Sequence, residues 1–74
     1  MSQELGFRIG LKVSGQKYQH LAWAPTLDAA EPFIQDHART QRGHSTVGSL
    51  ESHDYTWVAH AGQDAYMVER GARD

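Results

Sequence analysis

The chain has 74 residues, of which 39% are hydrophobic and 22% charged, a composition typical of one small globular domain. Its formal charge of −2 gives no bulk attraction to nucleic acid or an anionic membrane. The absence of cysteine excludes a disulfide framework and thiolate metal sites. No apolar run approaches the roughly 20 residues that span a bilayer. The first residues carry no signal-peptide pattern, so we expect a cytoplasmic protein without membrane contact.

The first part of the chain predicts a β-hairpin. Hydrophobic residues alternate with polar or small ones over residues 6–13, the period-two pattern of a half-buried strand, and a second strand is expected over residues 18–24. Gly15 and Gln16 would form the two-residue turn between them, with Gly15 at the position that needs a positive φ. The register that follows is Phe7 with Ala24, Ile9 with Ala22, Leu11 with His20 and Val13 with Tyr18 on one face, and Arg8 with Trp23, Gly10 with Leu21 and Lys12 with Gln19 on the other.

A helix is expected over residues 27–41. Pro25 ends the preceding strand because it cannot donate to a ladder, and Thr26 or Asp28 can cap the helix. Pro32 fits best in a first turn, so the helix starts either near Asp28 or at Pro32 itself. One helical stripe contains Leu27, Ala30, Ile34, His37, Ala38 and Gln41.

A second hairpin is expected at the end of the chain. Residues 43–54 are rich in Gly and Ser and predict a loop with room for a short strand at 46–50. Strands over 55–61 and 64–69 would then be joined by Gly62 and Gln63. The register that follows is Ala61 with Asp64, Ala59 with Tyr66, Trp57 with Val68 and Tyr55 with Arg70 on one face, and His60 with Ala65, Val58 with Met67 and Thr56 with Glu69 on the other.

These elements predict a single α+β domain of ββαββ order, in which an antiparallel sheet of four to five strands carries one helix on one face. Tyr18 and Tyr66 are expected to rim the helix side, with their hydroxyl groups reaching water or a partner. The expected helix-side residues are Phe7, Ile9, Leu11, Val13, Ala22, Leu27, Ile34, Ala38, Trp57, Ala59 and Val68.

The sequence carries no motif that specifies catalysis, a metal or a cofactor. Its five histidines lack the spacings that present two imidazoles together on a helix or a strand. Residues 43–48, GHSTVG, have one residue too many for a nucleophile elbow, and they follow a helix rather than a strand. We therefore expect no enzymatic activity, no metal and no cofactor.

A single helix covers only one side of a sheet, so the opposite face is the first candidate for function. An exposed Trp among other apolar side chains with a polar rim is typical of a protein interface. The candidate contact residues are Arg8, Leu21, Trp23, Val58, His60 and Met67. A second candidate surface at the end of the helix consists of Arg39, Arg42 and His44.

We therefore expect a small protein–protein interaction module, such as a binder, inhibitor or adaptor. It could also self-associate as a homodimer through the open sheet face or an edge strand. The alternative is a small nucleic-acid-binding module that uses the Arg and Lys side chains of the first hairpin and of the helix C-terminus. A metal or hydrolytic site built from the histidines is the third hypothesis.

Overall fold

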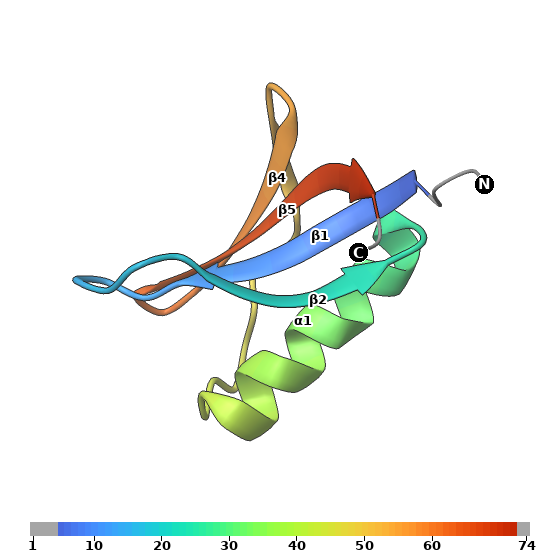
Figure 1. Ribbon diagram of the computed structural model, residues 1–74. Helices are drawn as coiled ribbons and strands as arrows, with labels where there is room; N and C mark the ends of the chain where they lie inside the picture. The colour runs from blue at the N-terminus through green and yellow to red at the C-terminus, as the bar shows by residue number, and fades with distance from the viewer. Residues whose placement is uncertain (1–4, 73–74) are drawn as a thin grey trace.

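One helix packs on one face of a twisted five-stranded antiparallel sheet (Figure 1). The computed structural model describes residues 5–72. In chain order the elements are β1 Leu5–Lys12, β2 Gln19–Ala24, α1 Leu27–Gln41, β3 Glu51–His53, β4 Thr56–Ala61 and β5 Asp64–Ala72. The strand order in the sheet is β2-β1-β5-β4-β3, so β5, the last strand in the chain, lies in the middle of the sheet. The expected α+β fold is thus confirmed.

The β4–β5 hairpin has the register that the alternation and the glycine turn predict. Six of the seven predicted cross-strand pairs, from Thr56 with Glu69 to Ala61 with Asp64, are present. The seventh prediction, Tyr55 with Arg70, is wrong, because β4 begins at Thr56 and Arg70 pairs with Phe7. Gly62 has a φ of 61°, a conformation that L side chains rarely adopt. The turn chemistry and the apolar pattern agree here, so the register has no competing solution.

The β1–β2 hairpin differs from the prediction at its turn. Gly15 has the expected positive φ, 80°. The Gln16 amide, however, donates a hydrogen bond to the Val13 carbonyl at 2.9 Å, so the tight turn is centred on Ser14 and Gly15. The loop continues to Tyr18 before β2 begins, so β2 is one residue shorter than expected, while β1 keeps its expected length but is shifted by one residue.

A β-bulge in β2 changes which residues face the helix. The pairs up to Ile9 with Ala22 are as predicted, but Gly10 then pairs with His20 instead of Leu21. Leu21 is the extra residue and packs against the core cluster, whereas His20 is exposed. The prediction that placed Leu21 on the open face and His20 on the helix side is therefore wrong, because an inserted residue exchanges the faces beyond it.

Helix α1 starts at Leu27, so the alternative in which the helix starts near Asp28 is the better one. The Thr26 side chain caps it, because its Oγ1 accepts a hydrogen bond from the Ala29 amide at 3.1 Å. Pro32 lies within the helix and is exposed. Gly43 has a φ of 72° and turns the chain away from the helix axis after Gln41.

The core lies between α1 and the sheet. All eleven residues expected on the helix side are buried there or packed against the buried cluster. Tyr66 does not rim this core: it is fully buried. Its hydroxyl group shares a 2.8 Å hydrogen bond with His37 Nδ1, and this partner allows a polar group to lie inside. Among residues 5–72, α1 is too short and too polar to cross a membrane.

The segment after the helix closes one edge of the sheet. Its short strand is β3 Glu51–His53 rather than residues 46–50. The Gly48 amide nevertheless donates to the His60 carbonyl at 2.8 Å, which extends the cover along β4. Val47 and Leu50 pack against the core, so burial of these two side chains holds the segment in place.

Candidate interaction surface

We call the face of the sheet opposite α1 the outer face. Along β1, the residues that alternate with the buried Ile9 and Leu11 point to it, because successive side chains of a strand alternate between faces. The register then places the neighbouring residues. From β2 to β3, the outer-face side chains are His20, Trp23, Arg8, Lys12, Ala65, Met67, Glu69, Thr56, Val58, His60, Glu51 and His53, together with Tyr18, which folds onto this face from the loop before β2.

Two aromatic rings lie against the backbone of β1 on this face. A Cβ atom built at Gly6 would overlap the Trp23 ring, and one built at Gly10 would overlap the Tyr18 ring. Both glycines are buried although no helix covers them. The Trp23 Nε1–H group also donates to the Gly71 carbonyl at 3.2 Å. The rings therefore fill hollows that the glycines leave, an arrangement that stabilises the sheet.

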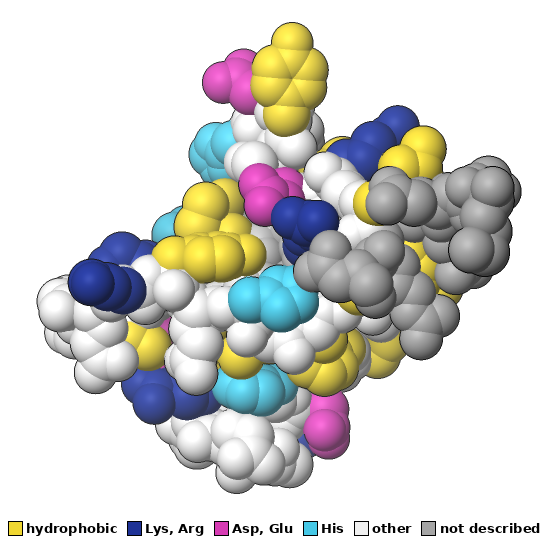
Figure 2. Space-filling view, in the orientation of Figure 1, with side chains coloured by type: hydrophobic (Ala, Val, Ile, Leu, Met, Phe, Trp, Pro, Cys, Tyr) yellow, Lys and Arg dark blue, Asp and Glu magenta, His cyan; other side chains and the backbone are white. Residues whose placement is uncertain are grey.

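The centre of the outer face is apolar. Met67 on the middle strand pairs with Gly10 on one side and with Val58 on the other. Because Tyr18 covers Gly10, its ring, Met67 and Val58 form one row across three strands, which we call the apolar stripe. Tyr18 is 44% exposed, and the other two are half-buried. Figure 2 shows hydrophobic side chains gathered over the sheet, with basic, acidic and His side chains around them.

Charged groups on both sides of the apolar stripe balance each other. Arg8 and Lys12 of β1 carry two positive charges, and Glu69 and Glu51 carry two negative ones, so these four groups sum to zero at neutral pH. These charges act on Tyr18: burial raises the pKa of its hydroxyl group, and the negative charge of Glu69 raises it further against the opposing effect of Arg8.

The structure brings together five of the six candidate contact residues. Arg8, Trp23, Val58, His60 and Met67 all lie on the outer face, whereas Leu21 is drawn toward the core by the bulge. Trp23 is not a free anchor, because its ring and its N–H group both contact the sheet. Sequence reasoning missed Tyr18 as a member of this surface. The glycine at position 10 is the signal that could have found it, since a ring can rest there.

The second candidate surface divides into an ion cluster around the buried Asp64 and a separate exposed arginine, Arg39. Asp64 is 4% exposed and accepts hydrogen bonds from Arg42, with Nε–Oδ2 at 2.9 Å and Nη2–Oδ1 at 3.3 Å. His44 Nε2 donates to the same Oδ2 atom at 2.8 Å. These bonds, first from Arg42 and then from His44, lower the pKa of the Asp64 carboxyl group. Arg42 and His44 thus fasten the segment after α1 to the start of β5.

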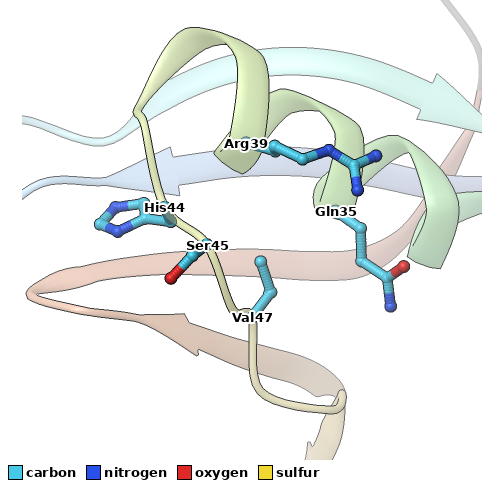
Figure 3. A pocket seen from close by; sticks show the side chains of 5 residues that line it. All are labelled: Gln35, Arg39, His44, Ser45 and Val47. Atoms are coloured by element: carbon cyan, nitrogen blue, oxygen red, sulfur yellow. The ribbon is translucent and has the colours of Figure 1, made fainter.

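A hollow of about 120 Å³ lies beside this cluster, between α1 and the segment that follows it (Figure 3). Figure 3 shows the Arg39 and Gln35 side chains pointing away from the His44 ring, which turns instead toward Asp64. Ser45 and Val47 complete the lining. The polar groups do not converge on one point, so the hollow has no arrangement that would activate a nucleophile or hold an anion.

Within residues 5–72, no three His, Asp or Glu side chains lie close enough together to hold a metal ion. No protein-family model, curated protein or solved structure matches the chain. The assignment of the candidate surface therefore depends on the arrangement of its residues in this structure.

Proposed function

We propose that this protein is a non-enzymatic interaction module that binds another protein through the outer face. One observation carries the proposal: within residues 5–72 the five-stranded sheet has a helix on one side only (Figure 1), and the centre of its other side is an apolar stripe with a charged and polar rim. An apolar centre that excludes water within a polar rim is the usual anatomy of a protein–protein interface.

The edge strands of the sheet are poorly suited to pairing with another chain, which favours binding through the outer face. β2 carries a bulge between its pairs with Ile9 and Gly10, and bulges disturb the row of backbone groups that an added strand would need. β3 has only three residues, all exposed, and Glu51 and His53 are two of them. Short edge strands with charged side chains discourage pairing, so we assign binding to the outer face.

The nucleic-acid alternative has less support, because several of its cations already have partners within the chain. Arg8 Nε donates to the Ala72 carbonyl at 3.3 Å, Lys12 Nζ donates to the Gln16 carbonyl, and Arg42 pairs with Asp64. The balanced charge of the outer face adds no attraction to phosphate.

Photocrosslinking from defined positions tests the proposal. A benzophenone amino acid is placed at Val58 on the outer face or, as a matched control, at the exposed Gln35 on α1, and the protein is irradiated in extract of its native cell. We expect protein adducts, identified by mass spectrometry, from position 58 and none from position 35. Equal labelling from both positions, or adducts with nucleic acid alone, would contradict the proposal.

A further inference from the structure

We infer that the partner of the outer face is a second copy of this chain, which would make a two-fold face-to-face dimer. The inference rests on the proposed function, since it specifies the occupant of the same face. It follows from three properties of that face: the position of the apolar stripe within the sheet, the distribution of charge, and the area available.

The apolar stripe is centred on the middle strand of the sheet. Met67 lies on β5, with β1 and β2 on one side and β4 and β3 on the other. A two-fold axis parallel to β5 and passing beside Met67 therefore places this residue against its own copy. The same rotation puts Val58 of one chain opposite Tyr18 and Gly10 of the other. The apolar stripe of one chain thus lies on the apolar stripe of the other in the opposite order, so apolar side chains contact apolar side chains, as an isologous interface requires.

The charges of the outer face suit a second copy of the same chain better than a strongly acidic or strongly basic partner. The rotation brings the half of the face that carries Arg8 and Lys12 opposite the half of the other chain that carries Glu51. Glu69 lies near the axis, where it would meet its own copy, but Arg8 is its direct cross-strand neighbour and offsets that repulsion. A strongly charged partner would gain little from a face whose fixed charges sum to zero.

The area is sufficient for a dimer of modest affinity. The five strands contain 32 residues, which at about 3.3 Å per residue and about 4.8 Å between strands cover roughly 500 Å² on each chain, or about 1,000 Å² in total. This value is below the range of tight complexes and typical of weak association. We therefore expect a dimer that forms between micromolar and millimolar concentrations and packs as two aligned sheets with the helices outside.

Analytical ultracentrifugation across that concentration range gives the first test. We expect the wild-type protein to convert from monomer to dimer. Met67→Lys should lower the association constant about tenfold or more, as for a residue at the centre of an interface. A lysine there has Glu69 two residues along the same strand, which favours a folded monomer. The matched control Gln35→Lys places the same charge on α1 and should dimerise like the wild type.

A crosslinking test depends on geometry rather than on affinity. The chain has no cysteine, so Met67→Cys introduces a single thiol beside the proposed axis and Gln35→Cys introduces one far from it. A short bis-maleimide should link Met67→Cys chains into dimers and leave Gln35→Cys chains as monomers. Failure of Met67→Cys to crosslink at concentrations where the protein is dimeric would overturn the inference.

The outcomes separate this inference from the proposed function. A wild-type chain that stays monomeric up to millimolar concentration overturns the second copy as partner, and photocrosslinking from position 58 then decides the function alone. A dimer that a folded Met67→Lys variant retains in full overturns the inference as well, because the chains then meet through another surface. Far-UV circular dichroism establishes that each variant is folded.

Discussion

The contact between Gly10 and Tyr18 offers the sharpest test of how the outer face is built. A methyl group at position 10 would overlap the ring of Tyr18. This ring belongs to a loop residue that is 44% exposed, so it can swing into solvent rather than force the backbone apart. We therefore expect Gly10→Ala to displace the ring and to remove its contact with the sheet.

The cost follows from the area that the ring loses. A buried aromatic side chain removes about 150–250 Å² from water, and Tyr18 is roughly half covered, so about 100 Å² would be re-exposed. At about 25 cal/mol per Å² this loss amounts to about 2.5 kcal/mol as an upper limit. Replacing glycine in a strand returns about 0.5–1 kcal/mol. The net destabilisation by Gly10→Ala should be about 1–2 kcal/mol.

A double-mutant cycle measures this coupling. Urea unfolding of the wild type, Gly10→Ala, Tyr18→Ala and the double variant gives the free energy of unfolding of each. Without the ring there is nothing to displace, so Gly10→Ala should be neutral or slightly stabilising in the Tyr18→Ala background. If Gly10→Ala costs the same in both backgrounds, Tyr18 does not rest on Gly10 and the apolar stripe loses one of its three members.

Two further predictions concern the turns and the ion cluster. Gly15→Ala and Gly62→Ala both place alanine at a positive φ, which costs about 1–2 kcal/mol, but only at position 62 would the new Cβ meet a side chain, with His44 Cε1 at 2.8 Å. The His44 ring would have to move, which weakens its hydrogen bond to Asp64. Gly62→Ala should therefore be the more destabilising of the two by about 1 kcal/mol in thermal unfolding. Equal destabilisation by both substitutions would show that His44 does not pack against Gly62. Asp64→Asn should lower stability at pH 7 by about 1 kcal/mol. Because its bond to Arg42 lowers the pKa of Asp64, this stabilisation exists above the unfolded value near 3.9 and is lost as the pH falls through the lower folded value. The difference between wild type and variant should thus shrink in acid; a difference independent of pH would refute the assignment.

The two hairpins show what sequence patterns can and cannot specify. In the second hairpin, Gly62 and the strict alternation around Trp57 and Val68 allow only one register that buries the apolar side chains, so the prediction holds for every pair within β4. In the first hairpin, the small residues Gly10 and Ala22 tolerate more than one pairing. The bulge at Leu21 depends on how that side chain packs against the core, and such tertiary packing leaves no local signal.

The polar interior was beyond sequence reasoning for a related reason. Asp64 and Tyr66 lie two residues apart on β5 and point to the same face of the sheet. Asp64 binds Arg42 and His44 from the segment after α1, and Tyr66 binds His37 of α1. Burial of a carboxylate or a phenol is favourable only when such donors and acceptors arrive from elsewhere in the chain. Local periodicity placed Tyr66 at the rim and assigned no role to Asp64, because it contains no information about those partners.

The bulge in β2, which the sequence analysis did not predict, also determines which side chains form the proposed interface. With a regular hairpin, Leu21 would stand opposite Gly10 on the outer face, and Tyr18 would lie on the helix side. The inserted residue turns Leu21 toward the core and lets Tyr18 fold over Gly10 instead. An aliphatic side chain is thus exchanged for an aromatic ring whose hydroxyl group lies in the field of Glu69. Tyr is enriched at interface centres because it offers a large apolar area with one polar group and few rotatable bonds, so the same local irregularity that protects the β2 edge from strand pairing supplies the outer face with a suitable contact residue.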